Sequence, residues 1–163
     1  MLRISKLTDY GTLIMTHMAS APERMMSAAE LADALGLGLA TVSKVLKALG
    51  RAALVVSQRG TRGGYRLSRP PAQISIADIV DALEEQPFGL TECSANSGVC
   101  NLESRCRIRD SWLRINAVVR NALQTVSIAE MTPAPLATQL LEHIPVTGEQ
   151  GVPGPDRLAR QPG

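Results

Sequence analysis

All three cysteines of this 163-residue chain fall in one short polar stretch, as Cys93-x6-Cys100-x5-Cys106. Ser, Asn, Gly and Glu dominate the residues between them, so the stretch has too little apolar surface to form a core of its own. Thiolates are soft ligands that favour zinc, copper(I) and iron–sulfur clusters over hard cations. We therefore predict that Glu92–Arg109, hereafter the cysteine loop, is a metal-cofactor site.

The start of the chain imitates a signal peptide, with two basic residues, an apolar patch and Ala19-Ser20-Ala21. Polar residues such as Thr8, Asp9 and Thr16 interrupt the patch, and no run reaches the length of a membrane-spanning helix. We expect a cytoplasmic protein with no membrane partner. In that reducing compartment, clustered cysteines act as ligands or redox thiols more often than as disulfides.

The net charge of +2 hides an uneven distribution. Residues 1–75 contain ten Lys and Arg against four Asp and Glu, whereas residues 76–131 contain five against eight. Residues 132–163 contain two against three. This asymmetry predicts that the first half alone meets a polyanion, although a solvated charged face would give the same composition.

After a first helix over residues 5–18, residues 27–52 are predicted to form two short helices joined by a glycine turn. Ser27 and Glu30 have the spacing of a capping box at the first of these helices. The second helix places one apolar stripe on one side and small polar or basic residues on the other: Thr41, Ser43, Lys44, Lys47 and Arg51. This pattern indicates a helix-turn-helix, although any helical hairpin in a bundle would share it.

Two short strands, 54–56 and 65–67, flank a loop rich in arginine and glycine, residues 58–64. Glycine lets the backbone approach a phosphate wall, and arginine binds phosphate bidentately or enters a narrow minor groove. A phosphate-binding NTP loop is a poor alternative because the Gly-Lys-Ser/Thr ending is missing. A helix-turn-helix followed by a basic hairpin is a winged helix. The candidate DNA contacts are Thr41, Ser43, Lys44 and Lys47 on the helix, and Arg59 and Arg62 on the wing.

The rest of the chain divides at the cysteine loop and again near residue 132. A helix over residues 76–83 precedes the loop, and a helix over 108–126 follows it with apolar residues at heptad spacing. That seam packs either on a second subunit or within its own chain. We predict three parts: a winged helix-turn-helix over 1–72, cluster-binding and dimerisation helices over 73–131, and a disordered Pro/Gly-rich tail over 132–163.

Together these segments resemble the family of iron–sulfur winged-helix regulators that includes IscR and NsrR, over residues 1 to about 132. The resemblance rests on residues 2–11, on residues 59–67 and on the loop from Thr91 to Cys106. It is nearest to the branch that regulates the SUF iron–sulfur assembly system, through Leu90-Thr91-Glu92-Cys93-Ser94 and the Thr41-Val42-Ser43-Lys44 helix. The implied fold is mainly α with a small β-hairpin wing and a long C-terminal dimerisation helix. The implied protein is a homodimeric repressor that binds double-stranded operator DNA.

The resemblance also implies a ligand set in which Cys93, Cys100 and Cys106 hold the cluster. Where IscR-like members have a histidine ligand, this chain has Arg109. NsrR-like members use an aspartate in a Thr-Asp-Tyr-Gly segment of the other subunit, so Asp9 is the candidate fourth ligand. Glu92 and Glu103 are the alternatives, and His17 is interpreted as structural. By analogy, the missing histidine favours a 4Fe–4S cluster over 2Fe–2S.

Three other interpretations remain open. The first is a cluster-free regulator whose cysteines oxidise, and the second is a structural zinc site, which the absence of a short Cys-x2–4-Cys knuckle disfavours. The third is an enzyme. No Cys-x-x-Cys, nucleophile elbow or paired catalytic histidine occurs, so we expect no enzyme and no small-molecule substrate.

Overall fold

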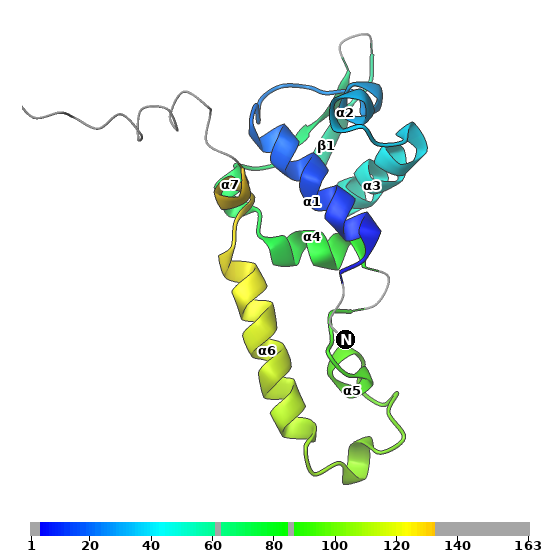
Figure 1. Ribbon diagram of the computed structural model, residues 1–163, viewed down its shortest axis with the longest axis vertical. Helices are drawn as coiled ribbons and strands as arrows, with labels where there is room; N and C mark the ends of the chain where they lie inside the picture. The colour runs from blue at the N-terminus through cyan, green and yellow to red at the C-terminus, as the bar shows by residue number, and fades with distance from the viewer. Residues whose placement is uncertain (1–3, 61–62, 85–86, 133–163) are drawn as a thin grey trace, which may run out of the picture. The chain divides into compact units, whose positions relative to one another are not determined.

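The computed structural model describes residues 4–60, 63–84 and 87–132, and these ranges all lie in one compact unit, Met1–Pro133. Three helices are followed by a two-stranded antiparallel hairpin and then by further helices (Figure 1). This arrangement is a winged helix, and it confirms the predicted fold class. The predicted tail lies outside the described residues except for Thr132.

The first three helices are α1 (Lys6–Ala19), α2 (Ala28–Leu35) and α3 (Leu39–Arg51). Helices α2 and α3 form the helix-turn-helix, and α1 packs on both of them. Ser27 and Glu30 form the predicted capping box at the start of α2. Gly36 ends α2 in the left-handed conformation, at φ 63°, which glycine adopts without a steric penalty.

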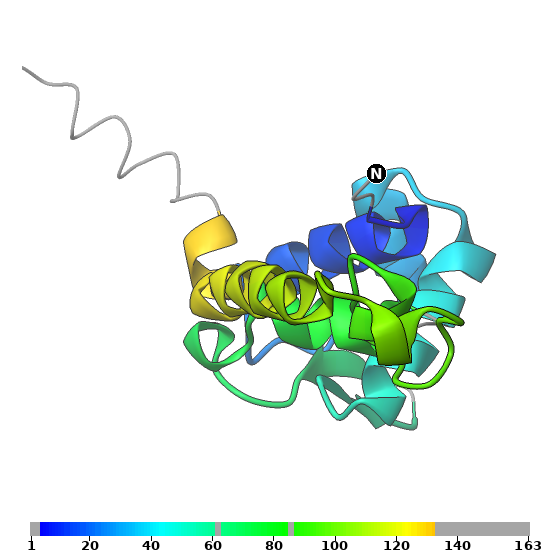
Figure 2. The ribbon, with the colours of Figure 1, turned by 90° about the horizontal axis from the view of Figure 1, so that it is seen from below.

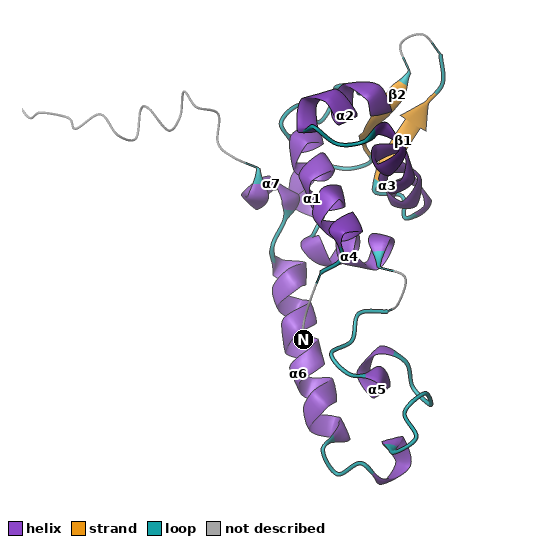
Figure 3. Cartoon of the chain, turned by 45° about the vertical axis from the view of Figure 1, so that its right-hand side comes forward, coloured by secondary structure: helices purple, strands orange, loops and turns teal. Residues whose placement is uncertain are grey.

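The wing consists of β1 (Val55–Gln58) and β2 (Gly64–Leu67), which pair antiparallel with Val55 opposite Leu67 (Figure 3). Each strand has four residues instead of the predicted three, because the ladder continues toward the tip of the hairpin, and Leu54 lies just before β1. Backbone hydrogen bonds between Met26 and Tyr65, 2.9 and 2.8 Å long, tie β2 to the segment before α2. The wing is thereby attached to the helix-turn-helix.

One hydrophobic core lies beneath α1, α3 and α4. The apolar stripe predicted for α3 is buried, and Val42, Val45 and Leu49 have no exposed surface. Complete burial of such side chains contributes about 1.5–3 kcal/mol each. The other fully buried large side chains come mainly from the neighbouring helices: Ile14, Met15, Leu31, Leu46, Ile74, Ile79 and Ile128.

Beyond the wing, a short 3-10 turn leads to α4, and the cysteine loop separates α4 from α6 (Figure 1). The elements are η1 (Pro71–Gln73), α4 (Ile76–Leu83), α5 (Glu92–Ala95), η2 (Glu103–Arg105), α6 (Arg109–Thr125) and α7 (Ile128–Met131). The short helix α5 was not predicted. No described helix is long and apolar enough to cross a membrane.

Helix α6 packs on α4 near its own C-terminal end and leads away from it, as comparison of Figure 1 with the view from below in Figure 2 shows. Side-chain and backbone hydrogen bonds join the two segments. Arg120 binds the Asp81 carboxylate through both guanidinium nitrogens, at 2.7 and 2.5 Å. After α6, the chain adds a short bridge between Ser75 and Ser127, in which the Ile76 amide donates to the Val126 carbonyl at 2.9 Å. None of the α6 side chains is fully buried within this chain.

Candidate functional site

The outer face of α3 carries two lysines with no carboxylate beside them. Lys44 and Lys47 are exposed, and neither forms an ion pair with another described residue. Thr41 and Ser43 are half-buried near the start of the same helix. Four of the predicted DNA contacts therefore lie on one short helix whose opposite face is core. Such a surface supplies cations for phosphates and hydroxyls for base edges.

The wing adds a further cation at some distance along the chain. Arg59 is exposed next to Gly60, whose φ of 117° lies in the region that favours glycine. Arg62, the second predicted wing contact, lies outside the described residues. Close approach of the backbone is visible at Gly64, where a Cβ atom would stand 2.6 Å from the Met26 carbonyl oxygen. The glycine is therefore needed to seat β2 against the chain before α2.

The three cysteines are free thiols that lie at different depths. Cys93 lies in α5, is 8% exposed, and has its sulfur 3.4 Å from the Thr91 hydroxyl oxygen. Cys100 and Cys106 are half-buried in the turns on either side of η2. The loop is thus partly folded rather than open chain.

The start of the cysteine loop is held against α6. The Leu90 amide donates a 3.1 Å hydrogen bond to the Asn116 side-chain oxygen, and α5 packs on α6. Gly89 lies so close to Ala95 that any Cβ at this position would overlap its backbone. These contacts fix Cys93 relative to the long helix.

Glu103 is the centre of a second set of contacts in the loop, which we call the Glu103 cluster: Glu103, Ser97, Gly98 and Arg109. The carboxylate accepts hydrogen bonds from the Gly98 amide at 2.5 Å and from the Ser97 hydroxyl at 3.0 Å. Arg109 donates from two nitrogens, at 3.0 and 2.8 Å. The Gly98 amide and the Arg109 guanidinium, in that order, hold the pKa of the Glu103 carboxyl below its ordinary value.

By their chemistry the three thiols suit a soft metal or an iron–sulfur cluster. Within the described residues, however, no group of three or more His, Cys, Asp or Glu side chains lies together as a metal site. One copy of the chain in this arrangement does not assemble a centre from Cys93, Cys100, Cys106 and Asp9. That ligand set therefore stays a prediction.

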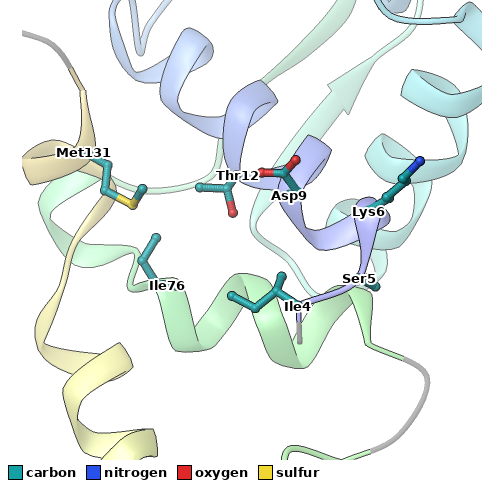
Figure 4. Close-up of a pocket in the computed structure, with 7 residues that line it drawn as sticks. All are labelled: Ile4, Ser5, Lys6, Asp9, Thr12, Ile76 and Met131. Carbon is teal, nitrogen blue, oxygen red and sulfur yellow. The ribbon is translucent and has the colours of Figure 1, made fainter. Parts of the chain in front are cut away.

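Asp9 lies on α1, exposed, and away from the cysteine loop in sequence. It lines a pocket of about 610 Å³ between the start of α1, the start of α4 and α7 (Figure 4). The other lining residues are Ile4, Ser5, Lys6, Thr12, Ile76 and Met131. Asp9 is thus at the surface, where a residue predicted to act across a subunit boundary must lie. His17, interpreted as structural, is half-buried in the last turn of α1.

Of the two alternative carboxylates, Glu92 is exposed at the start of α5 and Glu103 is engaged by Arg109. The sequence reasoning did not anticipate that pair, nor the Asn116 contact, because neither belongs to a recognised motif. The i, i+6 spacing of Glu103 and Arg109 is the one available signal, and it is too general to identify a contact.

Comparison with known proteins agrees with this geometry. A family model described as "Rrf2: Iron-dependent Transcriptional regulator" matches residues 4–134. The structure of CymR from B. subtilis, described as the global cysteine regulator, is 27% identical with a TM-score of 0.62, over 80% of this chain and 96% of that one.

Two other solved structures share the fold. CymR from Staphylococcus aureus is 25% identical with a TM-score of 0.59, over 80% of this chain and 98% of that one. IscR from T. potens is 24% identical with a TM-score of 0.61, over 92% of this chain and 94% of that one.

Proposed function

This chain belongs to the Rrf2 family of transcriptional regulators, and we propose that it is an iron–sulfur-sensing repressor that binds operator DNA as a homodimer. Regulators of this family act by binding DNA and not by catalysis. The observation that carries the proposal is the position of the three free thiols. They occupy one loop that is bonded at its start to α6 through Asn116 and at its end through Arg109.

For DNA, we propose that α3 enters the major groove and that the wing follows the backbone. Lys44 and Lys47 present unpaired charge to phosphates, and Thr41 and Ser43 lie at the end of α3 that meets base edges in a helix-turn-helix. Arg59, together with Arg62, is proposed to contact the groove beside the wing. We propose that the protein acts in the cytoplasm, because that is where it meets operator DNA.

For the dimer, we propose that α6 pairs with its copy across a two-fold axis. Ile108 is 59%, Ile115 46% and Val118 68% exposed, and with Ala122 and Val126 they lie on one side of the helix. Arg120 and Leu123 face α4 and the core from the other side. An apolar helical face of this length is more stable when a second apolar surface covers it.

For the cofactor, we propose Cys93, Cys100 and Cys106 as thiolate ligands, with Asp9 of the second copy as the fourth. A cluster so bound supplies redox and oxygen sensitivity. The oxygen ligand favours 4Fe–4S over 2Fe–2S, because a weakly held iron suits a sensor that loses or alters its cluster. The regulated genes are proposed to be those of the SUF assembly system.

The test is anaerobic purification of the protein beside Asp9→Ala. We expect a coloured protein with visible absorbance and acid-labile sulfide, a less stable cluster in Asp9→Ala, and operator affinity that changes when the cluster is removed. A colourless, iron-free protein with operator affinity that iron and sulfide do not change would overturn the proposal.

The second candidate is a cluster-free thiol switch, and a specific observation favours it. The chain shares its fold with CymR, described in B. subtilis as the global cysteine regulator, and one S. aureus CymR structure is described as an oxidized form. In this case the anaerobic protein is colourless, and diamide treatment, not iron removal, changes its affinity for the operator.

A further inference from the structure

The Glu103 cluster holds together three separate pieces of the cysteine loop. Ser97 and Gly98 follow α5, Glu103 begins η2, and Arg109 is the first residue of α6. The side chains of Glu103 and Arg109 are only 15% and 29% exposed, so their ion pair is partly sheltered from water. Charge-assisted hydrogen bonds from a planar guanidinium are among the stronger polar contacts in proteins.

The same contacts determine where the thiols lie. Cys100 lines a hollow of about 520 Å³ together with Ser97, Gly98, Ser104 and the Glu103–Arg109 pair. Cys93 is buried in α5. Within the described residues, the sulfurs do not form a three-ligand group. For all three sulfurs to bind one centre, parts of the loop must therefore move relative to one another. Glu103 joins those parts, because it binds Ser97, Gly98 and Arg109.

We propose that Glu103 and Arg109 are positioning residues that hold the loop in the arrangement in which the thiols form no three-ligand group, and that their ion pair opens before the thiols bind one centre. This inference rests on the proposed function, since it describes how the same loop is loaded. Arg109 lies three residues after Cys106 and fixes the loop through Glu103. Because Arg109 begins α6, opening of the pair also releases the start of the proposed dimer helix.

The first test measures hydrogen exchange at the Gly98 amide, which donates directly to Glu103. In the metal-free full-length protein we expect this amide to be protected. Glu103→Gln and Arg109→Gln each remove the charge pair and are expected to speed its exchange about tenfold. Arg107→Gln is the matched control, because Arg107 is exposed and has no ion pair with another described residue. Equal protection in all four proteins would overturn the proposal.

The second test measures convergence of the thiols without iron. Arsenite is the probe, because trivalent arsenic is soft and binds three thiolates, and uptake is followed by intact mass. Uptake is expected to be about tenfold faster in Glu103→Gln than in the wild type. Arg109→Lys keeps the positive charge but loses the planar guanidinium that donates two hydrogen bonds. Its rate of arsenite uptake is expected to lie between those of the wild type and Glu103→Gln. Uptake at the wild-type rate in Glu103→Gln would contradict the inference.

Failure of this inference is distinguishable from failure of the proposed function. Addition of ferrous iron and sulfide to the anaerobic wild type is expected to produce visible absorbance and to remove the Gly98 protection. Absorbance with the protection intact overturns the positioning role and leaves the cluster. No absorbance, with fast arsenite uptake in Glu103→Gln, overturns the cluster and supports the positioning role.

Discussion

The Thr8 hydroxyl donates a 2.6 Å hydrogen bond to the Glu84 carboxylate and so joins the first turn of α1 to the residue that ends α4. The Ser5 amide donates to the same carboxylate oxygen at 3.1 Å. Thr8 is 1% exposed and is the one buried polar side chain among the described residues. Since α1 packs on α3 and α4 leads to the cysteine loop, this contact lies between the proposed DNA-binding and sensing parts.

Replacement of Thr8 by valine tests the strength of this contact. The substitution keeps the shape of the side chain and removes the hydroxyl, so the Glu84 carboxylate loses a donor. We expect the free energy of unfolding to fall by about 1–2 kcal/mol, measured by urea titration. Thr16→Val is the control, because the Thr16 hydroxyl bonds only a carbonyl of its own helix, and we expect a smaller loss.

The same carboxylate predicts a dependence of stability on pH. Burial opposes ionisation of Glu84, but the hydrogen bonds from Thr8 and Ser5 outweigh it, so its pKa lies below the ordinary 4.5. A lowered pKa contributes stability that is fully present above 4.5 and is lost as the pH falls through the folded-state value. We expect wild type to exceed Glu84→Gln in stability at neutral pH, with the difference vanishing in acid. A stability difference that is constant from neutral to acidic pH would contradict this. In the Thr8→Val background, the effect of Glu84→Gln on stability at neutral pH should be smaller.

The local parts of the fold were predictable because each depends on a short pattern. The spacing of Val42, Val45 and Leu49 predicted the buried face of α3, and the Ser27–Glu30 spacing predicted the start of α2. The glycines and arginines after β1 indicated the wing. In each case the interacting residues lie within one or two helical turns or one hairpin.

The contacts between distant segments were not predictable in this way. Thr8 and Glu84 are 76 residues apart, and Arg120 and Asp81 are 39 apart, so no periodicity relates them. Helix α5 is short and polar, and it is held by packing on α6 rather than by its own propensity. The ligand set of the cysteine loop stays a prediction, because the three cysteines form no metal group within the described residues.

The proposed role of α3 in binding DNA predicts a change in salt dependence. Lys47→Ala is expected to weaken binding to operator and to unrelated duplex alike, because a phosphate contact carries no sequence information. Because the proposed dimer loses one phosphate contact per subunit, the slope of log affinity against log salt should become shallower by about 1.8. Arg114→Ala is the control, since Arg114 is an exposed cation on α6, and its slope should equal that of the wild type. An unchanged slope for Lys47→Ala would remove this residue from the interface.

The seating of the wing depends on the absence of a side chain at Gly64. In Gly64→Ala the new Cβ overlaps the Met26 backbone, so the two hydrogen bonds between Met26 and Tyr65 are expected to break. We expect a loss of about 2–3 kcal/mol in unfolding free energy. Gly50→Ala is the matched control. Gly50 lies in α3, and a Cβ there would stand an ordinary 4.0 Å from the Val55 side chain. We expect the unfolding free energy to stay unchanged or to rise by up to about 1 kcal/mol.

The exposed apolar face of α6 predicts the effect of a charge on assembly. Val118→Asp places a carboxylate on that face, and an unpaired charge costs several kcal/mol when a second apolar surface covers it. The protein is therefore expected to become monomeric in sedimentation and to lose operator affinity, while its helical circular dichroism is unchanged because Val118 is 68% exposed in the single chain. Gln124→Glu adds the same charge at an exposed position on the opposite side of α6 and should remain dimeric. If both variants sediment as the wild type does, α6 is not the dimer contact, and the cysteine loop would not reach a second copy through it.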